Sequence, residues 1–170
     1  TGLYATVGIL AALRHAEATG QGQQVDMALL DTQVAMLANL GANYLVEGQF
    51  SGKVPGRMGN AHVNIVPYQV FETAPKPSGE RDHLIVAVGN DGQFAKLCEI
   101  IGHPEWAKDP RFARNPDRVR HRDTLVPLLG KVFMQRNKSQ WLAEFERLQV
   151  PGAPINQLDE VFKDPQVQAR

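Results

Sequence analysis

A segment rich in glycine and proline, residues 48–59, constrains the fold of this chain more than any other feature. It shows neither the helical period of apolar residues nor the alternation typical of a strand. Its breakers are Gly48, Gly52, Pro55, Gly56 and Gly59. Because such a stretch does not continue a helix or a sheet, we predict that it joins two domains. The predicted organisation is a first domain at 1–48, a linker at 49–61 and a second domain at 62–170.

The first domain carries the patterns of a helix, a strand and a second helix. Apolar residues recur at helical spacing over residues 2–18, and Gly20 suits the left-handed position that follows a helix. Residues 23–29 alternate and predict a short strand. Asp31 is expected to cap the second helix. This order is typical of an α/β sheet protein, although one strand is too little for a sheet of its own.

The second domain begins with two apolar runs of strand length, residues 65–73 and 84–88. The polar loop at 74–82 separates them, so the pair predicts an antiparallel hairpin with a long loop. Towards the C-terminus, the prolines at 151 and 154 predict an extended segment. A short helix from Leu158, interrupted at Pro165, is expected to follow, and no closing strand is expected.

Three helical patterns lie between the hairpin and the extended segment. Asp91 is expected to cap the first helix and Gly102 to end it. The second is expected to start at Asp117, with Pro127 predicting a kink or a later start. Ser139 is expected to cap the third.

Composition excludes several classes of protein. The chain has 170 residues, and its 18 basic and 18 acidic residues cancel, so no net charge favours nucleic acid or an anionic membrane. No apolar run approaches the ~20 residues that span a bilayer. The single cysteine, Cys98, cannot form an internal disulfide, so the cytoplasm is the expected compartment. Its place on an apolar helix face predicts a packing role.

Four stretches have a specific order and spacing. They are Thr1-Gly2-Leu3-Tyr4 through Thr19-Gly20-Gln21-Gly22-Gln23-Gln24-Val25-Asp26; Gly59-Asn60-Ala61-His62 with Ile65-Val66-Pro67-Tyr68; Val86-Ala87-Val88-Gly89-Asn90-Asp91; and Asp109-Pro110-Arg111-Phe112 with Asn115, Arg118 and Arg122. Together they resemble class III CoA-transferases, the group that includes formyl-CoA, carnitine and succinyl-CoA-dependent dicarboxylate CoA-transferases. The resemblance covers nearly the whole chain.

The resemblance implies an α/β fold in which residues 1–48 are part of a Rossmann-like, CoA-binding large domain. Residues 62–170 would then form most of a smaller α+β domain. It also implies transfer of CoA from an acyl-CoA thioester to a free carboxylic acid, by a homodimer of interlocked chains. The CoA thioester is a substrate, and no metal and no permanently bound cofactor are expected.

The family resemblance places the nucleophilic aspartate three residues before Thr1. That carboxylate attacks the thioester, and an aspartyl-CoA intermediate follows. We therefore expect the catalytic residue upstream of Thr1, none within this chain, and no activity from the chain alone.

The same resemblance suggests two groups of substrate-binding residues. Thr1 and Gly2 follow the nucleophile, with helix-entry packing as the alternative interpretation. The second group is a loop that reaches the active site from the smaller domain and contains Gly59, Asn60, Ala61, His62 and Asn64. In formyl-CoA transferases this loop is a run of glycines that opens and closes. The present loop is more similar to that of transferases of dicarboxylate acyl groups, and we expect His62 either to donate a hydrogen bond to an acyl carboxylate or to be merely solvated.

Two other functions remain open from the sequence. One is an acyl-CoA racemase of the same superfamily, which moves an α-proton. The other is a non-catalytic interaction module.

A basic cluster is expected to be a solvated or subunit-facing surface; its members are Arg114, Arg118, Arg120, His121 and Arg122.

Overall fold

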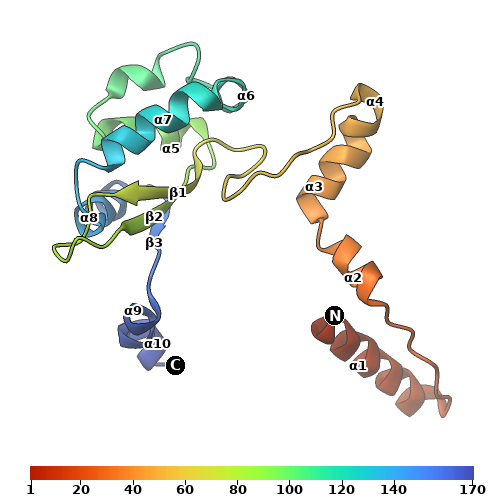
Figure 1. Cartoon of the computed structure of the whole chain (residues 1–170). Helices are drawn as coiled ribbons and strands as arrows, with labels where there is room; N and C mark the ends of the chain where they lie inside the picture. The colour runs from red at the N-terminus through yellow and green to blue at the C-terminus, as the bar shows by residue number, and fades with distance from the viewer. The chain divides into compact units, whose positions relative to one another are not determined.

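The computed structural model describes all 170 residues and divides into two compact units (Figure 1). Unit 1 comprises Thr1–Arg57 and unit 2 comprises Met58–Arg170. Neither unit contains a helix that is both long enough and apolar enough to cross a membrane.

Unit 1 is helical. Its first helix, α1 (Gly2–Thr19), confirms the predicted helix, and Gly20 follows it in the left-handed conformation with φ 74°. The further elements are α2 (Leu29–Ala35), α3 (Ala38–Asn43), the π-helical turn η1 (Tyr44–Gly48) and α4 (Gln49–Ser51). No side chain of α1 is buried, so apolar residues along it remain exposed.

Two predictions for unit 1 are wrong. Residues 23–29 form no strand, because no neighbouring strand offers them a ladder; instead the Val25 side chain packs over Gly8, where an added Cβ would lie 3.1 Å from it. The second helix starts earlier, with Ala28 as its N-cap and Asp31 in its first turn. The helical pattern is also interrupted between the end of α2 at Ala35 and the start of α3 at Ala38, whose φ is 29°.

Unit 2 is built on a three-stranded antiparallel sheet in the order β1-β2-β3 (Figure 1). The predicted hairpin is confirmed as β1 (Tyr68–Thr73) and β2 (Asp82–Ala87), with Phe71 opposite Leu84. Mixed helix and sheet content agrees with the predicted α/β class.

The predicted extended segment is confirmed as β3 (Gly152–Pro154), which joins the sheet as its third strand. β3 pairs with β2 on the edge away from β1. The pairing needs a glycine at 152, because a Cβ there would lie 2.6 Å from the ring of Phe145 and 2.9 Å from the carbonyl oxygen of Ile85. Close approach of two backbones is a common reason for glycine in a strand.

The helices of unit 2 are α5 (Asp91–Ile100), the 3₁₀ turn η2 (Pro104–Ala107), α6 (Asn115–Arg120), α7 (Arg122–Phe133), α8 (Lys138–Leu148), α9 (Leu158–Lys163) and α10 (Pro165–Gln168). Gly102 follows α5 with φ 77°, as predicted. The predicted interruption of the last helix at Pro165 is also confirmed.

Three predicted helix starts in unit 2 are wrong. The side chain of Asn90 caps α5 by accepting from the N–H of Gln93, which leaves Asp91 free to bind elsewhere. Asn137, rather than Ser139, caps α8 in a reciprocal capping box. The helix expected from Asp117 is two helices. α6 begins before that residue, and α7, which contains Pro127, begins at Arg122, in agreement with the later start that Pro127 predicted.

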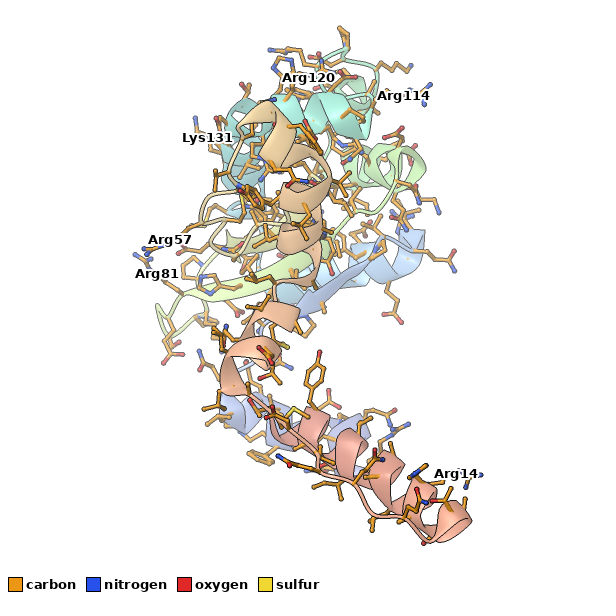
Figure 2. The ribbon with its side chains drawn as sticks, turned by 90° about the vertical axis from the view of Figure 1, so that its right-hand side faces the viewer. Arg14, Arg57, Arg81, Arg114, Arg120 and Lys131 are labelled. Atoms are coloured by element: carbon orange, nitrogen blue, oxygen red, sulfur yellow. The ribbon has the colours of Figure 1, made fainter.

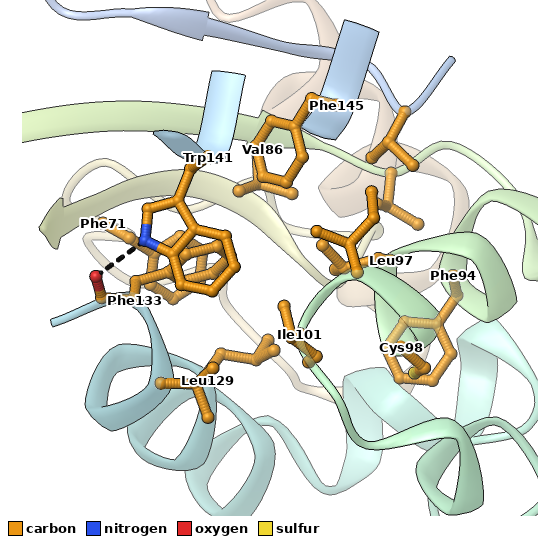
Figure 3. Close-up of a cluster of buried hydrophobic side chains, with 14 of the residues drawn as sticks. Phe71, Val86, Phe94, Leu97, Cys98, Ile101, Leu129, Phe133, Trp141 and Phe145 are labelled. Atoms are coloured by element: carbon orange, nitrogen blue, oxygen red, sulfur yellow. Dashed lines mark hydrogen bonds between the residues drawn. The ribbon is translucent and has the colours of Figure 1, made fainter. Parts of the chain in front are cut away.

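The core of unit 2 lies between one face of the sheet and helices α5, α7 and α8 (Figure 3). The ring of Phe133 is central to it, with ring centroids 4.9 Å from Phe71, 5.3 Å from Trp141 and 6.2 Å from Phe145. The indole N–H of Trp141 donates to the carbonyl oxygen of Phe133 at 2.9 Å, which satisfies the polar atom of a buried tryptophan.

A charged side chain, Arg118, is also fully buried in unit 2. Its guanidinium donates to the carbonyl oxygen of Val66 at 2.6 Å and to that of Phe112 at 2.8 Å, and it pairs with Asp91 at 3.0 Å. It also stacks 4.3 Å from the ring centroid of Phe94. Burial lowers the pKa of Arg118, and the hydrogen bond to Asp91 opposes that effect. The predicted surface position of this arginine is therefore wrong.

We predict that Arg118→Met lowers the free energy of unfolding of unit 2 by about 3 kcal/mol, since buried carbonyl oxygens lose their donors. Both tryptophans lie in unit 2, so their fluorescence in a urea titration reports this change. The matched control is Arg120→Met, because that side chain is 69% exposed and should change stability by less than ~0.5 kcal/mol. Equal stability of the two variants would contradict the structural role of Arg118.

Cys98 provides a second prediction. Its side chain is fully buried, and burial raises the pKa of its thiol from 9.0 to about 12. A thiol reagent at pH 8 should therefore label the native chain only as fast as unit 2 opens, and the unfolded chain at once. Because the unfolded state loses this proton near pH 9 and the native state retains it, the free energy of unfolding should fall as the pH rises between 9 and 12. Immediate labelling without denaturant would show that the thiol is exposed.

Candidate functional site

The first two candidate residues, Thr1 and Gly2, lie at the start of α1 in unit 1. The hydroxyl oxygens of Thr1 and Thr32 are 2.7 Å apart, and Thr32 also donates to the carbonyl oxygen of Leu29. Since a threonine has one hydroxyl proton, Thr1 is the donor of this pair. A hollow of about 350 Å³ adjoins them and is lined by Thr1, Tyr4, Leu29, Thr32, Gln33 and Met36.

Nothing within unit 1 requires glycine at position 2. A Cβ added there would meet no atom within 4 Å. Helix-entry packing, the alternative interpretation of this residue, therefore has no support from contacts inside the unit. The buried Thr32 was not singled out from the sequence, because its pairing with Thr1 depends on how α2 returns towards α1.

The second group lies in unit 2, in the segment that leads into β1. Gly59 has φ 60°, a conformation that favours glycine, and a turn follows in which the N–H of Ala61 donates to the carbonyl oxygen of Met58. The side-chain oxygen of Asn60 accepts from the N–H of Val70 at 3.0 Å. Asn60 therefore ties the loop to the strand that follows it.

Several interactions order His62. Its backbone N–H donates to the carbonyl oxygen of Tyr68 at 2.9 Å, and its ring stacks on that of Tyr68 with centroids 5.2 Å apart. Its Nδ1 accepts from the N–H of Asn64 at 3.0 Å, which places the proton of the neutral ring on Nε2. The ring is thus a hydrogen-bond donor with a defined direction rather than a freely rotating side chain.

Side chains of α6 and α7 bind the carbonyl oxygens of the loop. One nitrogen of Arg122, Nη2, donates to the carbonyl oxygen of His62 at 3.1 Å and to that of Val63 at 2.7 Å. The side-chain amide of Asn115 donates to the carbonyl oxygen of Asn64 at 2.8 Å. Three successive loop carbonyls are therefore held by side chains from outside the loop.

Arg118 extends this arrangement to Val66, because the Nε of Arg118 donates to the carbonyl oxygen of Val66. The N–H of Val66 in turn donates to the side-chain oxygen of Asn115. Asn115 and Arg118 lie three residues apart on α6, and Arg122 is the first residue of α7. We call Asn115, Arg118 and Arg122 the loop clamp. Asp91 supports the clamp by accepting from both the backbone N–H of Asn115 and the guanidinium of Arg118.

The sequence indicated the clamp residues as part of the family resemblance but gave them no role, and the prediction that the basic cluster is all surface is wrong. Arg118 is buried and Arg122 is half-buried, whereas Arg114 and Arg120 extend outward (Figure 2). The spacing of Asn115, Arg118 and Arg122 was the signal in the sequence that these side chains could act together. This spacing did not identify the loop, because the partner atoms are backbone carbonyl oxygens 51 to 59 residues away in the sequence.

A second hollow, of about 230 Å³, lies beside the loop and is lined by Ala61, Gln69, Arg122, Asp123, Val126 and Pro127. It brings a guanidinium and an amide to the edge of the loop, groups that can bind a carboxylate. No three histidine, cysteine, aspartate or glutamate side chains gather closely enough to hold a metal ion.

Comparison with known proteins identifies the family. The model of CoA-transferase family III matches residues 1–170. The chain is 48% identical to the succinate–glutarate CoA-transferase of Agrobacterium fabrum, over all of this chain and 40% of that protein. It is 41% identical to the human succinyl-CoA:glutarate CoA-transferase, over 98% of this chain and 36% of that protein.

A solved structure agrees with these relatives. The crystal structure of a CAIB/BAIF family protein from Brucella suis is 46% identical and superposes with a TM-score of 0.74, over all of this chain and 42% of that one. The chain thus spans about 40% of the length of the proteins it matches. From the match over its whole length, the chain belongs to CoA-transferase family III.

Proposed function

We propose that the full-length protein containing this chain transfers CoA from an acyl-CoA thioester to a free carboxylic acid. The observation that carries the proposal is the family match over all 170 residues, together with relatives that are themselves named CoA-transferases. The CoA thioester is a substrate in this proposal and needs no permanently bound cofactor.

The proposed chemistry uses an aspartate that precedes Thr1 in the full-length protein. Its carboxylate oxygen attacks the thioester carbonyl, and CoA leaves as a thiolate while a mixed anhydride forms. The thiolate then attacks the aspartyl carbonyl, which releases the donor acid and forms aspartyl-CoA. The acceptor carboxylate attacks this thioester, and the thiolate released then takes the acceptor acyl group, regenerating the aspartate.

In this proposal both groups of candidate residues contact the substrate. Thr1 and Gly2 contact it at the start of α1, where the missing Cβ of Gly2 leaves room. The loop residues Gly59, Asn60, Ala61, His62 and Asn64 contact the acyl group. A donor such as the Nε2–H of His62 suits a carboxylate at the far end of a dicarboxylate acyl chain. The names of the two relatives favour the same class, with succinate or succinyl-CoA as one partner.

We further propose that residues 1–48 are part of a larger CoA-binding domain, and that 62–170 form most of a smaller domain after a linker at 49–61. The exposed apolar side chains of α1 support this, because such a face is normally covered; they are Leu3, Val7, Ile9, Leu10 and Leu13. We also propose that the full-length protein is a cytoplasmic homodimer of interlocked chains.

The function is tested by incubating the full-length protein with succinyl-CoA and a panel of free dicarboxylic acids, and by following new acyl-CoA with chromatography. We expect exchange with dicarboxylates, a CoA thioester on the protein by mass spectrometry, and much slower exchange with formyl-CoA. The 170-residue chain alone should catalyse none. Loss of optical activity of a chiral acyl-CoA without any acceptor would instead support a racemase.

The role of His62 is tested by His62→Ala in the full-length protein. Loss of a hydrogen bond to a charged carboxylate should raise the KM for a dicarboxylate about tenfold or more, with a smaller change for a monocarboxylate. His103→Ala is the matched control, because that ring stacks on Trp106 and binds Glu105 far along the chain from the loop. An equal change for both acids would argue against direct recognition by His62.

A further inference from the structure

The loop at 59–64 differs physically from a glycine-rich flap. Its only glycine is Gly59, and side chains from outside the loop restrict the backbone of residues 62–64. Three successive carbonyl oxygens, those of His62, Val63 and Asn64, accept hydrogen bonds from α6 or α7. A segment that opens and closes would have to break all of these bonds together, which favours one conformation.

We propose that Arg122 is a positioning residue for substrate recognition, which acts by holding the loop at His62 and Val63 in a single conformation. The proposal rests on the proposed function, because only the proposed function gives the loop a substrate to recognise. Arg122 acts through the loop and need not touch the substrate itself. Its effect is to keep the His62 ring, which is already stacked on Tyr68, aimed in one direction before the substrate binds.

Arg122 is the member of the clamp whose loss should affect the loop alone. Arg118 is fully buried and supports the core, so its substitution also destabilises unit 2. Arg122 is half-buried at the rim of the 230 Å³ hollow beside Ala61, and its two hydrogen bonds reach only loop carbonyls. Lysine is a partial substitute, because its ammonium keeps the charge but lacks the rigid planar donor geometry of a guanidinium.

The first experiment measures amide hydrogen exchange of the 170-residue chain, with Arg122→Gln and the control Arg120→Gln. Arg120 is exposed and pairs with Asp117 on its own helix. In the Arg122 variant, exchange of the amides of His62 and Asn64 should accelerate about tenfold or more. The amide of Ala87, which donates to Pro151 in the sheet, should keep its wild-type rate and serves as the internal reference.

The second experiment measures steady-state kinetics of the full-length protein with succinyl-CoA and a dicarboxylate acceptor. Arg122→Gln should raise the KM for the acceptor about tenfold while kcat changes less than about twofold, since a loosened loop must be ordered on binding. Arg122→Lys should recover part of the loss, and Arg120→Gln should match the wild type. A purely structural role would instead lower the amount of active protein, and therefore kcat, without moving KM.

The outcomes separate the two proposals. Faster loop exchange together with a raised KM supports the role of Arg122. Wild-type exchange or a wild-type KM in Arg122→Gln, with an active wild-type enzyme, overturns that role and leaves the proposed function standing. A wild-type protein that transfers no CoA to any acid overturns the proposed function, and with it any part for Arg122 in substrate recognition.

Discussion

The buried guanidinium of Arg118 is the constraint around which the second unit is organised. A charge removed from water is tolerated only where donors and acceptors satisfy it, and breaking such an arrangement is costly. The carbonyl oxygens of Val66 and Phe112 and the carboxylate of Asp91 supply those partners. They come from the entry to β1, the turn before α6 and the start of α5. One side chain therefore sets the relative positions of three segments that are distant in the sequence.

The candidate loop derives its order from two neighbours of Arg118 in the sequence, one on α6 and one at the start of α7. Asn115 and Arg122 lie before and after Arg118, and each binds a carbonyl that precedes Val66 in the chain. The core and the loop are thus parts of one hydrogen-bonded arrangement. A loop restrained in this way is less mobile, and it therefore loses little conformational entropy when its polar side chains bind a ligand.

The two units differ in how much apolar surface they bury. Unit 2 contains every fully buried apolar side chain of the chain, and aromatic contacts around Phe133 join its sheet to α7 and α8. In unit 1 even the longest helix, α1, buries no side chain. Since burial of apolar surface is the main term that offsets chain entropy, unit 1 gains little stability by itself. This difference supports the proposal that unit 1 is part of a larger domain.

The sequence alone determined the features that depend on neighbouring residues: helix α1 with Gly20 after it, the β1–β2 hairpin, and the end of α5 at Gly102. These features follow from the local period of apolar residues and from the residues that form turns. The family resemblance followed from the order and spacing of the motifs. Only the tertiary structure decided which arginine is buried, because the carbonyl of Val66 that Arg118 binds is 52 residues away. The pairing of β3, which depends on the space that Gly152 leaves beside Phe145, was decided in the same way. Residues 23–29 alternate like a strand, but a strand also needs a partner, and the local pattern does not supply one.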